Sequence, residues 1–192
     1  MKRRSALAIL LVAAHTSGSV FAAEWDVGRL MQGLAQQRGG KVSFAEKKYL
    51  AILDRPVEST GELVYLPPAR LEKRTLTPKV ESLVLDRDLL VIERGKQRHT
   101  LQLQQYPEIT AIVDSIRDTL AGDLKALERQ YRVVLEGSQE RWMLTLLPSD
   151  PRIAAIVLRI QISGVRNELR QIEMLQADGD RSVMILDSPV PR

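Results

Sequence analysis

The chain has 192 residues, among them 28 Lys and Arg, 24 Asp and Glu, two His and no Cys. The absence of Cys excludes disulfide bonds, a thiol nucleophile, Cys-based metal centres and lipid attachment at a mature N-terminal Cys. Beyond the first four residues no run of Lys and Arg exceeds two, so we do not expect a basic surface that binds nucleic acid.

The N-terminus has the features of a secretory signal peptide. A basic start, Lys2-Arg3-Arg4, precedes an apolar run from Ala6 to Ala14, and Val20 and Ala22 are the small residues before an expected cleavage site. An apolar run of about ten residues is too short to span a bilayer, which needs roughly 20. We therefore predict that residues 1–22 are removed on export to the periplasm.

The remaining residues, 23–192, are enough for one domain with a sizeable core. The leader holds three basic residues and no acidic one, so 25 Lys and Arg face 24 Asp and Glu in this part, a net charge of +1. No later segment is long and apolar enough to span a membrane. We expect the exported domain to be a soluble monomer.

Two segments have apolar residues at the 3–4 spacing that predicts an amphipathic helix. The first runs from Glu24 to Arg38 and is ended by Gly39 and Gly40. The second covers residues 109–120, and a short piece at 123–127 extends it.

The rest of the chain has the composition and turn spacing of short strands. The predicted strands are, in chain order, residues 41–53, 57–66, 71–76, 80–85, 89–93, 99–103, 131–135, 142–147, 156–162, 169–175 and 182–186. Most connections are too short for the helix that a parallel crossover needs, so we predict an antiparallel meander. Because twist accumulates from strand to strand, a sheet of about eleven strands is expected to curl and to bury the helices on its concave side.

Several predicted strands are apolar on both faces. Leu83 and Leu85 alternate with Val84, and we expect Leu158, Ile160 and Ile162 to share a face opposite Val157. A sandwich core would explain this pattern, and so would an apolar cavity roofed by the helices. Such a cavity would suit acyl chains, because each buried methylene contributes about 0.8 kcal/mol.

Residues for catalysis are scarce. His99, the one His beyond the leader, lies in a predicted strand, and no nucleophile, phosphate-binding or metal-binding motif is present. Two pairs of turn carboxylates leave a hydrolase open as an alternative: Asp86 with Asp88, and Asp178 with Asp180. Because Asp in tight turns more often bonds the local backbone, we predict no enzymatic activity, no cofactor and no metal.

Short motifs follow the first helix, Val27–Gln37, in a characteristic order. They are Val42-Ser43-Phe44-Ala45-Glu46, Gly61-Glu62-Leu63, Pro67-Pro68-Ala69-Arg70-Leu71, Thr77-Pro78 and Leu147-Pro148. In this order, and with helices around 108–127, the chain resembles the LolA family of periplasmic carriers of outer-membrane lipoproteins. It departs from the family at Pro67, where members carry an Arg that latches a helical lid, and Arg70 is the candidate substitute.

The resemblance implies a mainly β (α+β) fold, an unclosed antiparallel β-barrel with a helical lid over an apolar cavity. It also implies three partners: an acyl lipid or lipoprotein as cargo, an inner-membrane donor transporter and an outer-membrane acceptor. The alternative is a non-catalytic adaptor or assembly factor that binds partners through sheet edges. The residues predicted to line the cavity and lid are Phe44, Leu63, Tyr65, Leu83, Leu85, Ile112, Ile116 and Trp142.

Overall fold

A single antiparallel sheet of eleven strands dominates the computed structural model, which describes residues 25–187. The strands are β1 (Gly40–Tyr49), β2 (Val57–Leu66), β3 (Arg70–Thr77), β4 (Glu81–Asp86), β5 (Leu89–Arg94), β6 (Gln97–Gln102), β7 (Tyr131–Ser138), β8 (Arg141–Pro148), β9 (Val157–Val165), β10 (Glu168–Gln176) and β11 (Arg181–Leu186). The predicted number of strands and their order along the chain are confirmed. The predicted signal peptide, residues 1–22, lies outside the described residues.

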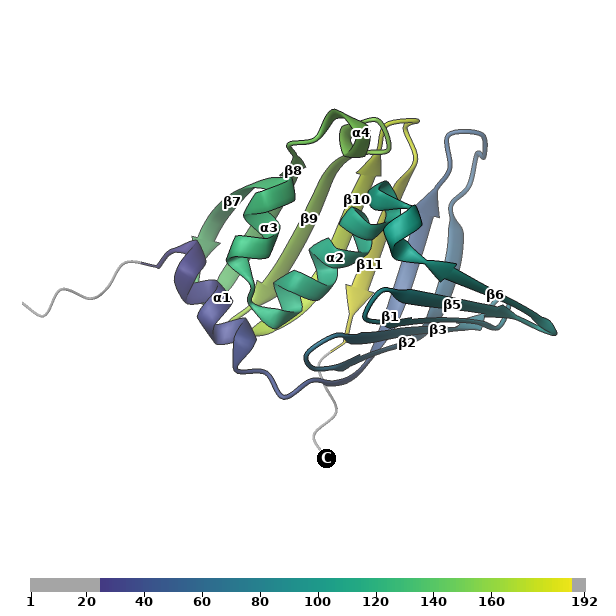
Figure 1. The fold of residues 1–192 in the computed structure, drawn as a ribbon, viewed down its shortest axis with the longest axis horizontal. Helices are drawn as coiled ribbons and strands as arrows, with labels where there is room; N and C mark the ends of the chain where they lie inside the picture. The colour runs from purple at the N-terminus through teal and green to yellow at the C-terminus, as the bar shows by residue number, and fades with distance from the viewer. Residues whose placement is uncertain (1–24, 188–192) are drawn as a thin grey trace, which may run out of the picture.

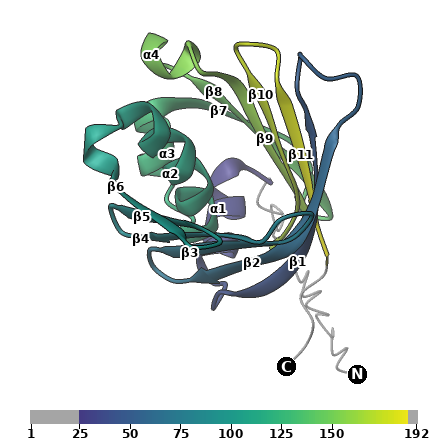
Figure 2. The same cartoon turned by 90° about the vertical axis from the view of Figure 1, so that its right-hand side faces the viewer.

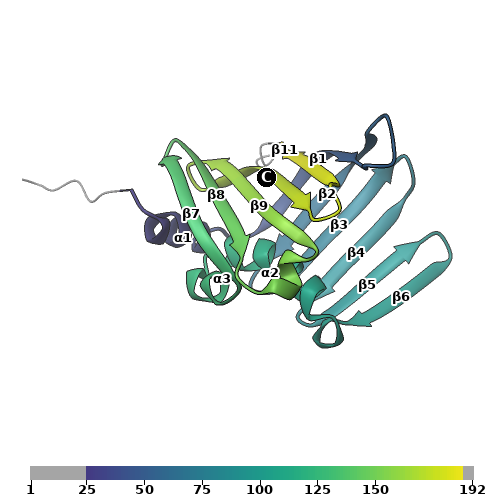
Figure 3. The same ribbon diagram turned by 90° about the horizontal axis from the view of Figure 1, so that it is seen from above.

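The sheet is an unclosed barrel. Its order is β6-β5-β4-β3-β2-β1-β11-β10-β9-β8-β7, so the first strand pairs with the last and β6 and β7 form the two edges. Figure 3 shows the strands side by side between these edges. The end-on view shows the sheet curving around the helices (Figure 2). The predicted curled antiparallel meander is therefore confirmed.

Helices occupy the concave side of this sheet, and a short one lies at its rim, where β8 continues into β9 (Figure 1). They are α1 (Val27–Ala35), α2 (Pro107–Ala121), α3 (Leu124–Gln130) and the short α4 (Pro151–Ala154), with a 3-10 turn, η1, at Leu103–Gln105. The Asp26 side chain caps α1 by accepting from the backbone N–H of Arg29 at 2.9 Å. Gly122 ends α2 with φ of 69°, a left-handed conformation that glycine adopts without strain.

The main core lies between the helices and β7–β9. Its fully covered side chains come from α1 and from the concave face of these strands, and include Leu30, Leu34, Trp142, Leu144, Leu146, Ile160 and Ile162. A second cluster of Phe44, Ile172, Met184 and Leu186 lies where β1 meets β11 and β10. The helices therefore cover one half of the concave face closely, and the other half, from β1 to β5, is packed more loosely.

Two local expectations are wrong. The predicted strand 41–53 ends at Tyr49, because the chain turns there: the N–H of Leu53 donates to the carbonyl of Leu50 at 2.9 Å, and Ile52 is 90% exposed with nothing to pack against. The predicted grouping of Leu158 with Ile160 fails as well. A register shift between β9 and β10 turns Val157 into the core, fully buried, and leaves Leu158 48% exposed.

Gly61 on β2 makes room for an aromatic ring. It faces Phe44 of β1 across the ladder, and a Cβ at this position would lie 2.8 Å from Phe44 Cε1 and would also collide with the Arg74 carbonyl. Ala at this position therefore has to displace a ring and a neighbouring strand.

We expect Gly61→Ala to lower the free energy of unfolding by about 2–3 kcal/mol, as overpacking of a filled core does. The measurement is a urea titration followed by far-UV circular dichroism. Gly95→Ala is the control, because a Cβ there meets no atom within 4 Å and only its positive φ of 60° is unfavourable. Its expected cost is about 1 kcal/mol. Equal costs for the two variants would contradict the close approach at Gly61.

Candidate functional site

A cavity of about 750 Å³ lies between α2 and the sheet. Small-molecule sites in proteins commonly occupy roughly 300–1,000 Å³. The sheet contributes an aliphatic wall of Leu63, Leu71, Leu83, Leu85, Leu90, Ile172, Met174, Met184 and Leu186. Helix α2 covers this wall with Ile112, Val113, Ile116 and Leu120. The cavity is therefore a largely apolar site between α2 and the concave face of strands β1–β5, β10 and β11.

Strand register explains why these side chains converge. Leu63 of β2 and Leu83 of β4 flank Lys73 of β3, and in the next row Tyr65 and Leu85 flank Leu71. Residues two apart on a strand share a face, so alternate side chains of one strand reach the cavity together. In β4 the outward Val84 alternates with Leu83 and Leu85, as expected from the sequence.

Six of the eight residues predicted for the cavity do line it: Leu63, Tyr65, Leu83, Leu85, Ile112 and Ile116. Phe44 and Trp142 lie outside this lining. Phe44 faces the concave side but is 3% exposed, packed with Ile172, Met184 and Leu186. Trp142 is 1% exposed in the main core, where its indole N–H donates to the Arg166 carbonyl at 2.7 Å.

Sequence reasoning missed the wall contributed by β10 and β11. Ile172, Met174 and Met184 reach the cavity only because the last strand pairs with the first, bringing Met184 opposite Glu46. Alternation of apolar residues in 169–175 and 182–186 marks these strands, but the pairing of distant segments that places them beside β1 has no local signal.

The connection between α2 and the sheet differs from the predicted latch. Arg70 lies 3.5 Å from Asp86 on the neighbouring strand, an exposed ion pair within the sheet, so it does not substitute for the family's lid Arg. Instead Arg117 of α2 donates through Nη1 to the carbonyl of Arg87, in the turn between β4 and β5, at 3.3 Å. Here the arginine is on the helix and the backbone acceptor is on the sheet.

Arg117 is held by two carboxylates of its own helix. Its guanidinium lies 2.9 Å from Asp114 and 3.4 Å from Asp118. Burial raises the pKa of Asp114 from 3.8 to about 6, and the Arg117 charge only partly opposes this shift. Asp114 Oδ1 accepts no well-aligned hydrogen bond from the described residues, so the ion pair is its main compensation.

The raised pKa of Asp114 predicts a pH-dependent stability. The folded state binds this proton more tightly than the unfolded chain does, so the contribution of Asp114 to stability falls as the pH rises from about 4 to about 6. We expect the free energy of unfolding of Asp114→Asn, relative to that of the parent protein, to increase by about 2–3 kcal/mol as the pH rises across this window. Urea titrations at several pH values measure it.

Asp150→Asn is the matched control: Arg152 lowers the pKa of Asp150, so this carboxyl stays ionised between pH 4 and 6 and its removal should leave the slope across that window unchanged. If the free energies of unfolding of the parent protein and of Asp114→Asn change in parallel between pH 4 and 6, the raised pKa of Asp114 is contradicted.

Three charged side chains, Glu46, Lys48 and Lys73, lie together at the part of the wall formed by β1 and β3. Glu46 is 5% exposed, and one of its oxygens is 2.6 Å from the Lys73 ammonium and 3.9 Å from that of Lys48. Ser59 donates to the same carboxylate at 3.3 Å. Burial lowers the pKa of Lys73, although Glu46 opposes the shift. Glu46, Lys48 and Lys73 all line the cavity.

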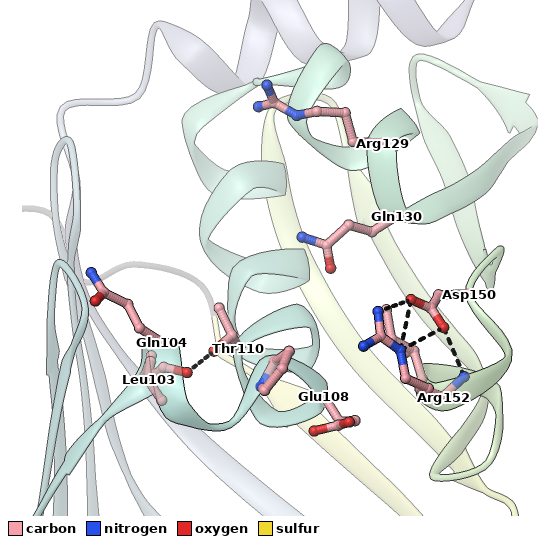
Figure 4. Close-up of a pocket in the computed structure, with 10 residues that line it drawn as sticks. Leu103, Gln104, Glu108, Thr110, Arg129, Gln130, Asp150 and Arg152 are labelled. Atoms are coloured by element: carbon pink, nitrogen blue, oxygen red, sulfur yellow. Dashed lines mark hydrogen bonds and ion pairs between the residues drawn. The ribbon is translucent and has the colours of Figure 1, made fainter.

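A smaller hollow of about 300 Å³ lies where the start of α2 approaches the end of α3 and α4 (Figure 4). Its polar groups bond locally. Thr110 donates to the Leu103 carbonyl at 2.6 Å, and Arg152 pairs with Asp150 at 2.7 Å, which holds the first turn of α4. These contacts stabilise helix ends, and we assign no ligand to this hollow.

The turn carboxylates proposed for a hydrolase each have local partners. Asp86 pairs with Arg70, and Asp88 accepts from the Gln104 side chain at 3.1 Å. Asp178 accepts from the N–H of Asp180, and Asp180 accepts from that of Ala51 at 2.8 Å. Within residues 25–187 there is neither a cluster of three potential metal ligands nor a helix long and apolar enough to cross a membrane.

Comparison with known families decides the assignment of the chain. The family described as outer membrane lipoprotein carrier protein LolA-like matches residues 19–189. The chain belongs to this family. The predicted resemblance is confirmed, and this LolA-like chain has the unclosed barrel and the covering helix that the resemblance implied. No curated protein matches the sequence.

Solved structures are similar to this LolA-like chain at low sequence identity. A LolA-superfamily protein from Nitrosomonas europaea has 10% identity and a TM-score of 0.47, covering 88% of this chain and 94% of the other. MucB of Pseudomonas aeruginosa, in complex with MucA, has 14% identity and a TM-score of 0.46, covering 88% of this chain and 59% of the other. A putative outer membrane lipoprotein-sorting protein domain from Vibrio parahaemolyticus has 7% identity and a TM-score of 0.41, covering 84% and 89%.

Proposed function

We propose that this LolA-like chain is a non-enzymatic periplasmic carrier that binds the acyl chain of a lipid or lipoprotein in its cavity. In this proposal it takes the cargo from an inner-membrane donor and delivers it to an outer-membrane acceptor. The observation that carries the proposal is the cavity of about 750 Å³ that aliphatic side chains line between α2 and the sheet, in a member of this family.

The energy of acyl burial fits a carrier. A chain of 10–15 methylenes gains roughly 8–12 kcal/mol on leaving water, at about 0.8 kcal/mol each. Association itself costs at least about 4 kcal/mol in lost freedom of motion. The remainder supports binding that is firm enough for transport and weak enough for release to a partner.

Release requires that α2 move away from the wall. The contact of Arg117 with the Arg87 carbonyl is exposed, so its loss costs little in water. Helix α2 also packs on α1 and α3, and the side chains that it presents to the wall border the cavity. A partner that binds the open arrangement more tightly would shift the population toward release.

Two measurements test the proposal. Titration of the purified protein with a fluorescent fatty acid should give saturable binding of one probe per chain. Transfer of that probe between two populations of lipid vesicles should accelerate in proportion to protein concentration. Binding without accelerated transfer would leave a lipid-binding protein and contradict the carrier role. Absence of saturable binding would contradict both.

A further inference from the structure

Charged side chains of β1 and β3 lie together at one part of a largely aliphatic cavity wall. Glu46 and Lys48 face inward on β1, opposite Ser59 of β2 and Ser182 of β11 respectively. Lys73 faces inward on β3 between Leu63 and Leu83. Its ammonium lies 5.0 Å from the centre of the Phe44 ring and 2.6 Å from Glu46. Glu46, Lys48 and Lys73 therefore gather in one part of a largely aliphatic cavity.

Gly61 permits this arrangement. The Phe44 ring lies over Gly61, and Lys73 extends across β2 above that ring to reach Glu46 on β1. A side chain at Gly61 would displace the ring on which the Lys73 ammonium rests. Gly61 thus serves the partly buried Lys73 ammonium as well as the packing of the sheet.

The charges in this part of the cavity do not balance. Two ammonium groups, those of Lys48 and Lys73, share the single carboxylate of Glu46. Among the other charged groups that line the cavity, Glu72 pairs with Arg74, Glu168 with Arg170 and Arg181 with Glu173, whereas the Asp180 carboxylate accepts from the N–H of Ala51 in a turn. Within the group of Glu46, Lys48 and Lys73, one positive charge therefore remains beside the aliphatic wall.

Lys73 is the less hydrated of the two cations. Its side chain is 22% exposed, against 49% for Lys48, and burial lowers its pKa even with Glu46 in contact. An ammonium in this position has lost water that one carboxylate only partly replaces, so a second anion nearby is favourable.

We propose that the cavity takes an amphiphile with an anionic headgroup, a carboxylate or a phosphate, which Lys73 and Lys48 bind while its acyl chain lies along the wall under α2. This inference rests on the proposed function and names the chemical class of the cargo. A cationic headgroup is disfavoured because the Glu46 carboxylate is already bonded to Lys73 at 2.6 Å. A neutral headgroup would leave the excess charge uncompensated.

The test compares ligands that share one acyl chain and differ only in headgroup. Hexadecanoic acid, hexadecyl phosphate, hexadecanol and hexadecylamine each compete with a fluorescent fatty acid, in mildly alkaline buffer. We expect at least one of the two anions to bind about 10-fold more tightly than hexadecanol, as a charge-assisted contact provides. The tighter of the two anions identifies the headgroup, and the amine should bind most weakly.

Two variants assign the effect to residues. Lys73→Met keeps most of the length and the apolar body of the side chain, and should remove most of the difference between the anion and hexadecanol without weakening hexadecanol. Glu46→Gln keeps the shape and removes the competing carboxylate, so it should increase the preference for the anion. The second variant keeps the inference testable if the first does not fold.

The outcomes separate this inference from the carrier function. Equal affinity of the parent protein for the anions and hexadecanol, or tighter binding of the amine, would overturn the anionic headgroup and leave acyl binding intact. Failure of every ligand to bind would contradict the proposed function itself. A preference for the anion that survives in Lys73→Met and is unchanged in Glu46→Gln would overturn the assignment to this group.

Discussion

Ile112→Glu is expected to weaken binding of a fluorescent fatty acid by about 100-fold. Ile112 lies on the face of α2 that covers the cavity, so its replacement sets a carboxylate against the acyl chain. Ligand binding would then have to strip water from that charge, at a cost of several kcal/mol that the protein can lower only by protonating the group. A loss of about 2.8 kcal/mol corresponds to 100-fold in affinity.

Ile109→Glu is the matched control for this variant. It makes the same chemical change on the same helix, but Ile109 is 38% exposed and does not line the cavity. We expect its probe affinity to stay within about 2-fold of the parent protein. Equal effects of the two variants would mean that the probe does not lie under α2. Circular dichroism establishes that both variants are folded before titration.

Trp142→Ala is expected to destabilise the protein by about 3–5 kcal/mol, the usual cost of removing a large buried aromatic side chain. The ring is almost fully covered in the core beneath the helices, and it also packs against Gly164, where a Cβ would meet the ring at 2.8 Å from Cε2. The midpoint of thermal unfolding should fall by roughly 10 °C for a domain of this size.

The variant Trp142→Phe separates the ring from its hydrogen bond. It keeps much of the packing and loses the donor to the Arg166 carbonyl, so a smaller cost of about 1–3 kcal/mol is expected. Because Trp142 lies outside the cavity, the folded fraction of either variant should bind the fatty-acid probe with parental affinity. A large loss of affinity in folded Trp142→Phe would place the indole in the binding site after all.

The strand order was predictable because it depends on local features. Short alternating runs separated by turn residues such as Arg94-Gly95-Lys96 and Asp178-Gly179-Asp180 permit little except hairpins. The pairing of β1 with β11 follows less directly, since it depends on where the curvature of the whole sheet brings its first and last strands.

The division of concave residues between core and cavity was not predictable from the same pattern. Phe44 and Leu63 both face inward, on neighbouring strands, yet Phe44 is covered and Leu63 lines the cavity. The difference depends on which part of the face the helices reach. Likewise, alternation placed Val157 on the wrong face because a single register shift at the start of β9 has no marker in the sequence.

The charged group in the cavity also escapes sequence reasoning. Glu46 and Lys73 are separated by 27 positions and lie on strands that are not adjacent, so no spacing rule connects them. The sequence instead pointed to Arg70 and Pro67 as the residues that set the lid apart from the family. The contact that joins α2 to the sheet comes from Arg117, whose acceptor is a backbone carbonyl that no residue type reveals.

The most direct test of acyl binding identifies by mass what the protein carries when it is purified from the cells that produce it. Native mass spectrometry, followed by analysis of a solvent extract, should find one acyl lipid or lipoprotein acyl chain per chain of protein. The extract from Ile112→Glu should contain little of it. Protein that is repeatedly free of lipid, and that takes up no fatty-acid probe, would contradict the carrier and favour an adaptor that works through its sheet edges.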